Sequence, residues 1–382
     1  MIHAIELCQQ LIRFPSVTPK DEGIISFIVS VLEPLGFTCY VLPFTDNHHR
    51  VVNNLYARRG TAVPNVCFAG HVDVVPPGDI ALWSQPPFAG SLHNDVIWGR
   101  GAVDMKGAIA AFISAVASAF DHQGSISLLI TGDEEGDATH GTKKVIEWLT
   151  ERGESIDFCI VGEPTSDKLL GDTIKVGRRG SLSGELTVIG TQGHVAYPDK
   201  ASNPIPKIIR LLSALDTYVF DNGYQQFQPS NLEITSVDVG NPTANVIPGQ
   251  ATARLNVRFN PTYSSVLLER TLRRVLDQEL IPYTLTVKAG SEPFATTDSH
   301  PAISTLEKAI KNITGVSPQR STSGGTSDAR FIKKICPVVE FGLMNHCAHK
   351  IDEHVPIQHL QQLAQIYHEF IHSFFACREQ NN

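Results

Sequence analysis

The sequence predicts an α/β protein in which a mixed sheet covered by helices is interrupted by an inserted ferredoxin-like domain. Up to about residue 179, short apolar runs typical of buried parallel strands alternate with segments whose apolar residues recur at helical spacing. From about residue 180 to 291, the strand-like segments instead alternate apolar and polar residues, as expected of a sheet with one buried face. After residue 291 the first pattern returns.

The first part contains three predicted buried strands. Residues 66–68 lead to His71, residues 125–130 (SISLLI) end at the acidic segment TGDEE, and residues 158–161 (FCIV) end at GEP. Helical patterns cover 105–120 and 142–153, and the second ends at a glycine. This order of strands and helices predicts a sheet with helices on both faces.

The middle part follows the order β-α-β-β-α-β, which is typical of ferredoxin-like domains. We expect its strands at 182–189, 232–239, 251–259 and 283–287, and its helices at 203–220 and 264–280. The third strand places five apolar side chains on one face, namely Ala251, Ala253, Leu255, Val257 and Phe259. A helix near 303–313 and a buried strand at 337–341 return to the first domain. The predicted domains are therefore 1–179 with 292–382, and 180–291.

Composition narrows the class of protein. A chain of 382 residues, 42% hydrophobic and 18% charged, can bury two sizeable cores. The net charge of -8 argues against a nucleic-acid partner, and the densest basic stretch, 270–274, lies on a helical pattern. No apolar run is long enough to cross a membrane, and the N-terminal segment lacks the pattern of a secretory signal. The 7 cysteines include no CxxC, which indicates reduced thiols, so we expect a cytoplasmic location.

Five side chains of metal-ligand type end or follow apolar runs: His71, Asp104, Glu135, Glu163 and His349. Open α/β sheets place their ligands at the carboxyl ends of strands. Two imidazoles and three carboxylates suit a pair of Zn²⁺-like ions, with one carboxylate left to bridge them. The pattern therefore predicts a metal-dependent hydrolase.

Some of these residues have ordinary alternatives. Asp104, in GRGAVDMKG, precedes a helix and could be its N-cap. Glu134 and Glu135 are adjacent, so one can ligate metal while the other faces the water that a general base must deprotonate. Asp73, two residues after His71, could orient that imidazole or turn away.

Two further positions depend on their surroundings. Glu163 follows a buried strand and needs a partner, such as a metal or an arginine. His349 competes with His346 and His354, and spacing alone does not choose among the three.

Taken together and in order, these blocks resemble the M20 metallopeptidase family, whose members include glutamate carboxypeptidases, aminoacylases, acetylornithine deacetylases and desuccinylases. The resemblance covers essentially the whole chain, and it implies a catalytic domain with an inserted lid and dimerisation domain. It implies that Asp104 bridges two zinc ions, of which Co²⁺ can replace one. One ion takes His71 and Glu163, and the other takes Glu135 and His349, which HKIDE selects by its likeness to the family's last block. It further implies Glu134 as general base and Asp73 as the acid that supports His71.

Three further motifs are closest to the succinyl-diaminopimelate desuccinylase branch of this family. They are GRRGSLSGELTVIGTQGHVAYP at 177–198, NVIPG at 245–249 and STSGGTSDARFI at 321–332. The resemblance makes His194 a lid histidine that reaches the partner's active site in a homodimer, and Asn245 a substrate-binding amide. A substrate with several carboxylates needs cationic side chains and backbone N–H groups, for which Arg178, Arg258, Gly325 and Thr326 are candidates.

The activity that this resemblance implies is hydrolysis of the amide bond of N-succinyl-LL-2,6-diaminopimelate to succinate and LL-2,6-diaminopimelate, in bacterial lysine and diaminopimelate biosynthesis. A water activated by the two zinc ions would attack while Glu134 removes its proton. The alternatives are an acetylornithine deacetylase or aminoacylase of the same family, and a dipeptidase. A non-catalytic scaffold is disfavoured because every ligand position and the base position are filled.

Overall fold

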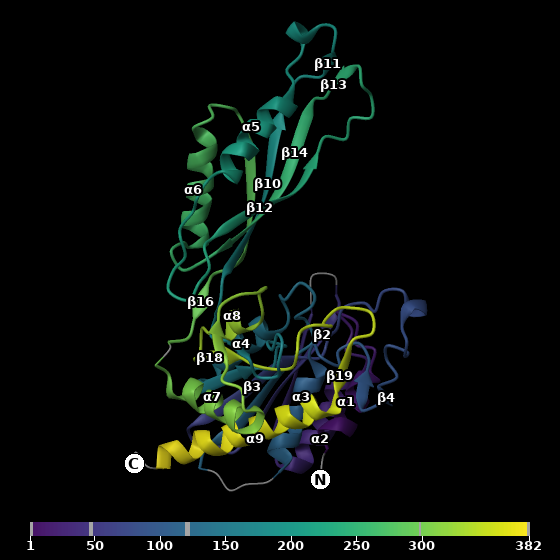
Figure 1. Cartoon of the computed structure of the whole chain (residues 1–382), viewed down its shortest axis with the longest axis vertical. Coiled ribbons are helices and arrows are strands. Elements are labelled where there is room, and N and C mark those ends of the chain that lie inside the picture. The colour runs from purple at the N-terminus through teal and green to yellow at the C-terminus, as the bar shows by residue number, and fades with distance from the viewer. Residues whose placement is uncertain (1–2, 46–48, 119–122, 298, 380–382) are drawn as a thin grey trace. The chain divides into compact units, whose positions relative to one another are not determined.

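The computed structural model describes residues 3–45, 49–118, 123–297 and 299–379, and it divides the chain into two compact units (Figure 1). The first unit is Met1–Val176, Thr296–Ser321 and Ser327–Asn382. The second is Gly177–Ala295 with Thr322–Thr326.

The first unit is built on an eight-stranded mixed sheet of order β1-β2-β6-β3-β7-β18-β8-β17. Its strands are β1 (Thr38–Thr45), β2 (Val51–Arg59), β3 (Asn65–His71), β6 (Ser125–Thr131), β7 (Phe158–Val161), β8 (Thr173–Lys175), β17 (Gln319–Ser321) and β18 (Val338–Glu340). The neighbours β6, β3, β7 and β18 run parallel to one another, so their carboxyl ends share one edge.

The central strands β3, β6 and β7 are buried at every residue. Because successive side chains point to opposite faces, full burial means that both faces of the sheet are covered. The helices of this unit are α1 (Ala4–Ile12), α2 (Ile24–Leu32), α3 (Lys106–Ala117), α4 (Thr142–Glu151), α7 (Pro301–Thr314), α8 (Ala329–Ile332) and α9 (Ile357–Glu379), with short 3₁₀ turns at η1 (Glu33–Leu35) and η2 (Ile80–Leu82). Helices α1, α3, α7 and α9 pack together, whereas α4 packs on β2 and β6 and against α8.

Aromatic packing ties the α3 and α9 helices to the sheet. The rings of Phe68 and Phe112 stack at 4.4 Å between centroids, and the Tyr367 ring meets both edge-on. The buried Tyr367 hydroxyl donates to the backbone oxygen of Phe341 at 2.7 Å, which satisfies its polar end. A small sheet of β4 (Ser91–His93), β5 (Val96–Trp98) and β19 (His354–Pro356) completes the unit.

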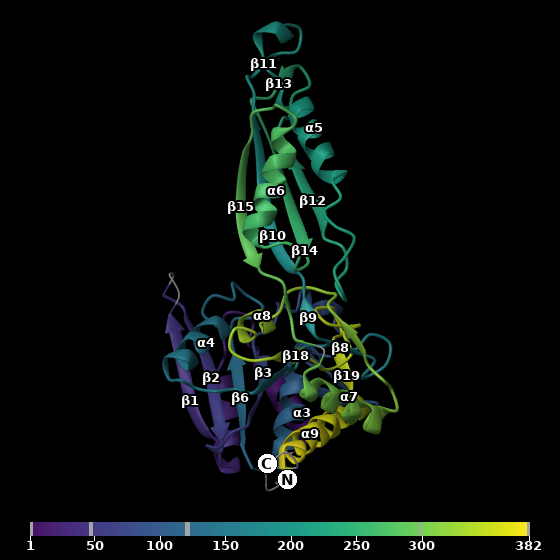
Figure 2. The same ribbon diagram turned by 90° about the vertical axis from the view of Figure 1, so that its left-hand side faces the viewer.

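The second unit is a four-stranded antiparallel sheet carrying two helices, visible in Figure 2. Its strands are β10 (Gly180–Ile189), β12 (Asn231–Asp238), β14 (Gln250–Phe259) and β15 (Thr284–Ser291), its helices are α5 (Pro204–Asp216) and α6 (Ser265–Asp277), and its shorter elements are β9 (Gly177–Arg178), β11 (Gly193–His194), η3 (Pro198–Lys200), β13 (Val246–Ile247) and β16 (Phe294–Ala295). The order β12-β14-β10-β15 is the ferredoxin-like arrangement.

The predicted fold class is confirmed in this sheet. All five side chains expected on one face of β14 are buried in the core beneath α5 and α6, and Ala253, Val257 and Phe259 are fully enclosed. The division differs from the expected one at its bounds, because 177–179 and 292–295 lie with the second unit, and it differs also in the separate segment Thr322–Thr326. This segment is held there by the Thr322 hydroxyl, which donates to the Gln226 backbone oxygen, and by Arg178, which donates to Ser323.

The structure describes the side chains of six cysteines, and none of these forms a disulfide. Cys67, Cys159 and Cys336 are buried among apolar residues, as expected for small hydrophobic side chains. Among the helices described, none combines the length and apolar character needed to span a bilayer.

Candidate metal centre

Six of the predicted site residues meet at the carboxyl edge of the parallel strands. His71 ends β3, Glu134 and Glu135 follow β6, and Glu163 follows β7. His349 lies on the loop between β18 and β19, and Asp104 lies just before α3. Adjacent parallel strands therefore bring together residues that are up to 278 positions apart in the sequence, as His71 and His349 are.

His71 is held in one orientation inside the protein. Its ring is buried, and Nδ1 donates to the backbone oxygen of Asp73 at 2.8 Å. Nε2 lies 3.1 Å from Asp104 Oδ1 and 3.8 Å from Glu163 Oε1. Burial lowers the pKa of His71, but the hydrogen bond and charge of Asp104 outweigh it and raise this pKa well above 6.5. An imidazole bonded this way through Nδ1 presents Nε2 to a metal.

Asp104 lies between two imidazoles. Its Oδ1 faces His71, and its Oδ2 lies 3.2 Å from His349 Nε2. Burial would raise the pKa of Asp104, but hydrogen bonds from His349 and His71 hold it well below its usual range. The N-cap alternative is wrong, because α3 begins at Lys106 after Met105 and has no side-chain cap. A carboxylate with one oxygen toward each imidazole is placed to bridge two ions.

Of the three histidines considered, His349 is the one that lies beside Asp104 and Glu135. Its Nε2 lies 2.7 Å from Glu135 Oε1, in addition to its contact with Asp104. Hydrogen bonds to Asp104 and Glu135 raise the pKa of His349 from 6.5 to about 10. His346, on the same loop, and His354, at the start of β19, lie against each other instead.

The carboxylates complete two overlapping groups that could hold a metal ion. His71, Asp104 and Glu135 each offer a ligand atom within 4.8 Å of the others, and so do His71, Glu134 and Glu163. Burial, and after it the charge of Glu163, raises the pKa of Glu134 well above its usual value. Without metal, protons on the imidazoles offset these charges, so metal ions that displace those protons fit the donor set.

The Asp73 carboxylate orients the acidic loop instead of the His71 ring. Its oxygens accept the backbone N–H of Glu134 at 3.2 Å and of Glu135 at 3.0 Å. The nearest approach of this carboxylate to His71 Nδ1 is 3.8 Å, whereas the backbone oxygen of Asp73 is at 2.8 Å. Asp73 therefore supports both the histidine and the two glutamates, through different atoms.

Sequence reasoning missed three buried groups behind the centre. Glu353 Oε1 accepts the N–H of Val103 and of Asp104, and Oε2 accepts from Arg100 at 2.7 Å. Asp328 is buried, its charge contributes to the raised pKa of Glu134, and burial raises its own pKa to about 6. The only sequence signal for Asp328 was its place in the motif STSGGTSDARFI, and for Glu353 its place after HKID.

The remaining predicted residues belong to the second unit. His194 is exposed on β11, and Asn245 adjoins its partner strand β13, where the Asn245 backbone oxygen accepts from Val195 at 3.2 Å. Arg178 Nη1 donates to the Ser323 backbone oxygen at 3.3 Å, beside Gly325 and Thr326. Arg258 lies on β14, paired in register with Ser181.

A cluster of imidazoles and carboxylates at the carboxyl edge of an α/β sheet is the typical site of a metal-dependent hydrolase. A family model described as Peptidase family M20/M25/M40 matches residues 67–373, so the chain belongs to this family.

Individual relatives agree with this assignment. A protein of Caulobacter vibrioides named succinyl-diaminopimelate desuccinylase is 52% identical over 380 residues, which covers 98% of this chain and 97% of that protein. The M20 family metallo-carboxypeptidase Sso-CP2 from Sulfolobus solfataricus has a similar structure, with a TM-score of 0.78 at 20% identity over 97% of this chain and 99% of its own. Bacillus subtilis YXEP, described as a dinuclear metal binding peptidase from the M20 family, has a TM-score of 0.67 at 16% identity over 98% of both chains.

Proposed function

We propose that the protein hydrolyses the amide bond of N-succinyl-LL-2,6-diaminopimelate to succinate and LL-2,6-diaminopimelate. The observation that carries the chemistry is Asp104, with one oxygen toward His71 and the other toward His349. The observation that carries the substrate is 52% identity, over 98% of the chain, to a protein named succinyl-diaminopimelate desuccinylase. The proposed pathway is bacterial lysine and diaminopimelate biosynthesis, and the free cysteines agree with a cytoplasmic location.

Two zinc ions are the proposed cofactors, with Co²⁺ possible in one position. His71 and Glu163 would hold one ion, Glu135 and His349 the other, and Asp104 both. Imidazole and carboxylate ligands suit either metal. The ions would polarise the amide carbonyl and lower the pKa of the attacking water.

Glu134 is the proposed general base. It removes a proton from the water as the oxygen attacks the succinyl carbonyl, and it returns that proton to the nitrogen of the leaving amine. The oxygen of water ends in the new carboxylate of succinate, and the amine leaves as diaminopimelate. A base whose pKa is raised well above the usual glutamate value by burial and by Glu163 suits both transfers.

Cationic side chains of the second unit are the proposed sites for substrate carboxylates. Arg178 adjoins the loop that contains Gly325 and Thr326, whose backbone N–H groups can bind an anion. Within the described residues, no carboxylate pairs with Arg258. Burial, and after it the charge of Arg258, lowers the pKa of Arg179, so two cations stand close together where an anion would be stabilised.

His194 and Asn245 are the proposed contacts from a partner subunit. His194 Nδ1 accepts the Ala196 N–H at 3.0 Å, so Nε2 carries the proton and can donate to the oxyanion that forms at the carbonyl. The pairing of β11 with β13 places Asn245 next to this strand. A homodimer formed through the second unit is expected, and the edge strand β12 with its exposed Val237 is a physical basis for it.

The test is a steady-state assay of the zinc-loaded protein on N-succinyl-LL-diaminopimelate and N-acetylornithine, with a chelator-treated control. We expect a strong preference for the succinyl substrate that is lost on chelation and restored by zinc. Preference for the acetyl substrate would favour the deacetylase or aminoacylase alternative. No metal-dependent turnover of either substrate would overturn the proposal.

The role of Glu134 is tested by Glu134→Gln. We expect kcat to fall by about 10²–10⁴-fold, because a general base contributes an effect of that size, while zinc content stays unchanged. Turnover close to that of the unmodified enzyme would exclude Glu134 as the base.

A further inference from the structure

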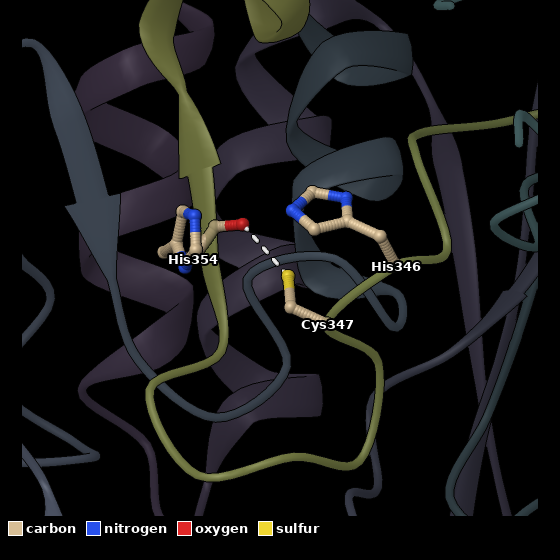
Figure 3. A group of neighbouring side chains, drawn as sticks. All are labelled: His346, Cys347 and His354. Atoms are coloured by element: carbon tan, nitrogen blue, oxygen red, sulfur yellow. Dashed lines mark hydrogen bonds between the residues drawn. The ribbon is translucent and has the colours of Figure 1, made fainter. Parts of the chain in front are cut away.

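A second cluster of metal-ligating side chains lies on the loop that contains His349. His346, Cys347 and His354 each present a ligand atom within 4.8 Å of the other two. Figure 3 shows the thiol of Cys347 between the two imidazole rings, with a nitrogen of His346 on the side that faces it. The proposed catalytic centre contains only imidazole and carboxylate donors, so a thiolate makes this cluster chemically different.

The ring of His354 is fixed in position. Its Nδ1 lies 2.7 Å from the backbone oxygen of Asp352, a contact in which the ring must be the donor. Nε2 therefore keeps a lone pair, which is the arrangement usual for histidines that bind metals. The ring also lies against Trp98, at 4.7 Å between centroids, because His354 and Trp98 pair in register across β19 and β5.

Cys347 and His346 supply the other two ligand atoms, and they differ in their exposure to solvent. Cys347 is buried, and its thiol donates to the backbone oxygen of His354 at 3.2 Å. His346 is exposed, and its ring meets that of His354 edge-on at 5.6 Å between centroids. A metal ion could therefore reach the buried thiol from the side of His346.

The local charges limit which ions this cluster can hold. Lys350 lies near both His346 and Cys347 and opposes any cation, whereas Glu353 lies near Cys347 but is already paired with Arg100. The surrounding charges therefore do not attract a cation, so affinity must come from the ligand atoms. One thiolate and two imidazoles suit Zn²⁺ and other borderline or soft ions, and they disfavour Mg²⁺ and Ca²⁺.

We propose that His346, Cys347 and His354 bind a transition-metal ion of the Zn²⁺ type, separate from the catalytic pair, and that this ion clamps the loop containing His349. On binding, the Cys347 S–H bond breaks, a sulfur–metal bond forms, and the proton passes to solvent. The remaining coordination position is open to water. The ion would join Cys347 and His354, which flank His349 in the sequence, and so restrict the motion of a catalytic ligand.

Titration with Co²⁺ tests the site through a signal that does not depend on turnover. Thiolate bound to Co²⁺ gives a charge-transfer absorption in the near ultraviolet, which imidazole and carboxylate ligands do not give. We expect this band to saturate when one Co²⁺ per chain has bound in addition to the catalytic pair, and to disappear in Cys347→Ser. Cys39→Ser, which changes a partly exposed thiol on β1, is the control and should keep the band.

The exposed residue His346 provides a variant that should fold normally. His346→Gln is expected to weaken metal binding by a factor of roughly ten or more. Loss of an outer-shell partner already weakens binding by about that factor, and loss of a ligand should weaken it more. The double variant Glu135→Gln, Glu163→Gln removes ligands from the catalytic pair and should keep the band. This variant separates failure of the third site from failure of the proposed function.

Several results would overturn the proposal. One is the absence of a thiolate band in the unmodified protein when Co²⁺ exceeds three equivalents per chain, and another is a band that survives Cys347→Ser. An unchanged affinity in His346→Gln would remove that residue from the site. Loss of the band in the double variant would show that the thiol depends on the catalytic centre.

Discussion

The side chain of Glu353 holds the backbone of Asp104, whose N–H it accepts at 3.1 Å. The same oxygen accepts the N–H of Val103 at 2.9 Å, and the other oxygen pairs with Arg100 at 2.7 Å. Arg100 and Glu353 are both buried, so this ion pair depends on both partners remaining charged. The carboxylate of Asp104, which lies between the two imidazoles of the candidate metal centre, is therefore positioned by an ion pair that touches no ligand atom.

Glu353→Gln should lower the free energy of unfolding by about 3–5 kcal/mol, because it leaves Arg100 buried without a countercharge. The amide oxygen can still accept the N–H groups of Val103 and Asp104, so the loss of unfolding free energy measures the contribution of the ion pair. Urea denaturation of the metal-free protein measures this difference.

The matched control is Glu307→Gln, which breaks the more exposed pair between Glu307 and Arg320 at 2.7 Å. Partly solvated pairs contribute about 1 kcal/mol or less, so this variant should change stability little. Equal losses of unfolding free energy in the two variants would show that the buried pair of Glu353 and Arg100 is no more stabilising than an exposed one.

Asp73→Asn separates the two supporting contacts of Asp73. The amide keeps one acceptor oxygen, so one of the N–H groups of Glu134 and Glu135 loses its partner, while the backbone oxygen that orients His71 is unchanged. We expect kcat/KM to fall by about 10–100-fold, as for other outer-shell partners, with weaker zinc binding at the Glu135 position alone. Stepwise zinc titration and steady-state rates measure both effects.

The control for Asp73 is Asp133→Asn in the same loop. Asp133 is buried, and its carboxylate also accepts two backbone N–H groups, those of Thr139 and His140, both at 2.9 Å. This variant should lose stability and keep both zinc affinities. If Asp73→Asn abolished binding at the His71 position, the carboxylate and not the backbone would be the support of that histidine.

The part of the site that sequence could predict is the part that local rules determine. His71, Glu135 and Glu163 follow apolar runs that become parallel neighbours, and parallel strands share an edge. The buried face of β14 was likewise predictable, because alternation along one strand defines that face.

Other features depend on contacts that no local pattern contains. The choice of His349 over His346 and His354 rested on a family resemblance, since the three lie within nine residues of sequence. The path between them includes left-handed backbone at His349 and Asp352. The pair of Arg100 and Glu353 joins residues 253 positions apart. Strands β1 and β2 were not predicted, because β1 is an exposed edge strand with little apolar alternation.

Removing metal should make the protein's stability depend on pH through His349. In the metal-free protein, Asp104 and Glu135 raise the pKa of His349 from 6.5 to about 10. A group whose folded pKa is raised contributes stability that is complete below its unfolded pKa and is lost as pH rises through its folded pKa. The stabilising effect of His349 should therefore be full below about pH 6.5 and should disappear by about pH 10.

Urea denaturation of the chelated protein and of His349→Gln, at several pH values, measures this effect. The free energy of unfolding of the unmodified protein should exceed that of the variant most at about pH 6, and the difference should narrow as pH rises toward 10. With zinc present this pH dependence should reverse, so that the difference in unfolding free energy grows as pH rises. The reason is that zinc ions and protons compete for the imidazole, and zinc binding strengthens as pH rises. A difference that stays constant across this range without metal would show that His349 does not share its proton with Asp104 and Glu135.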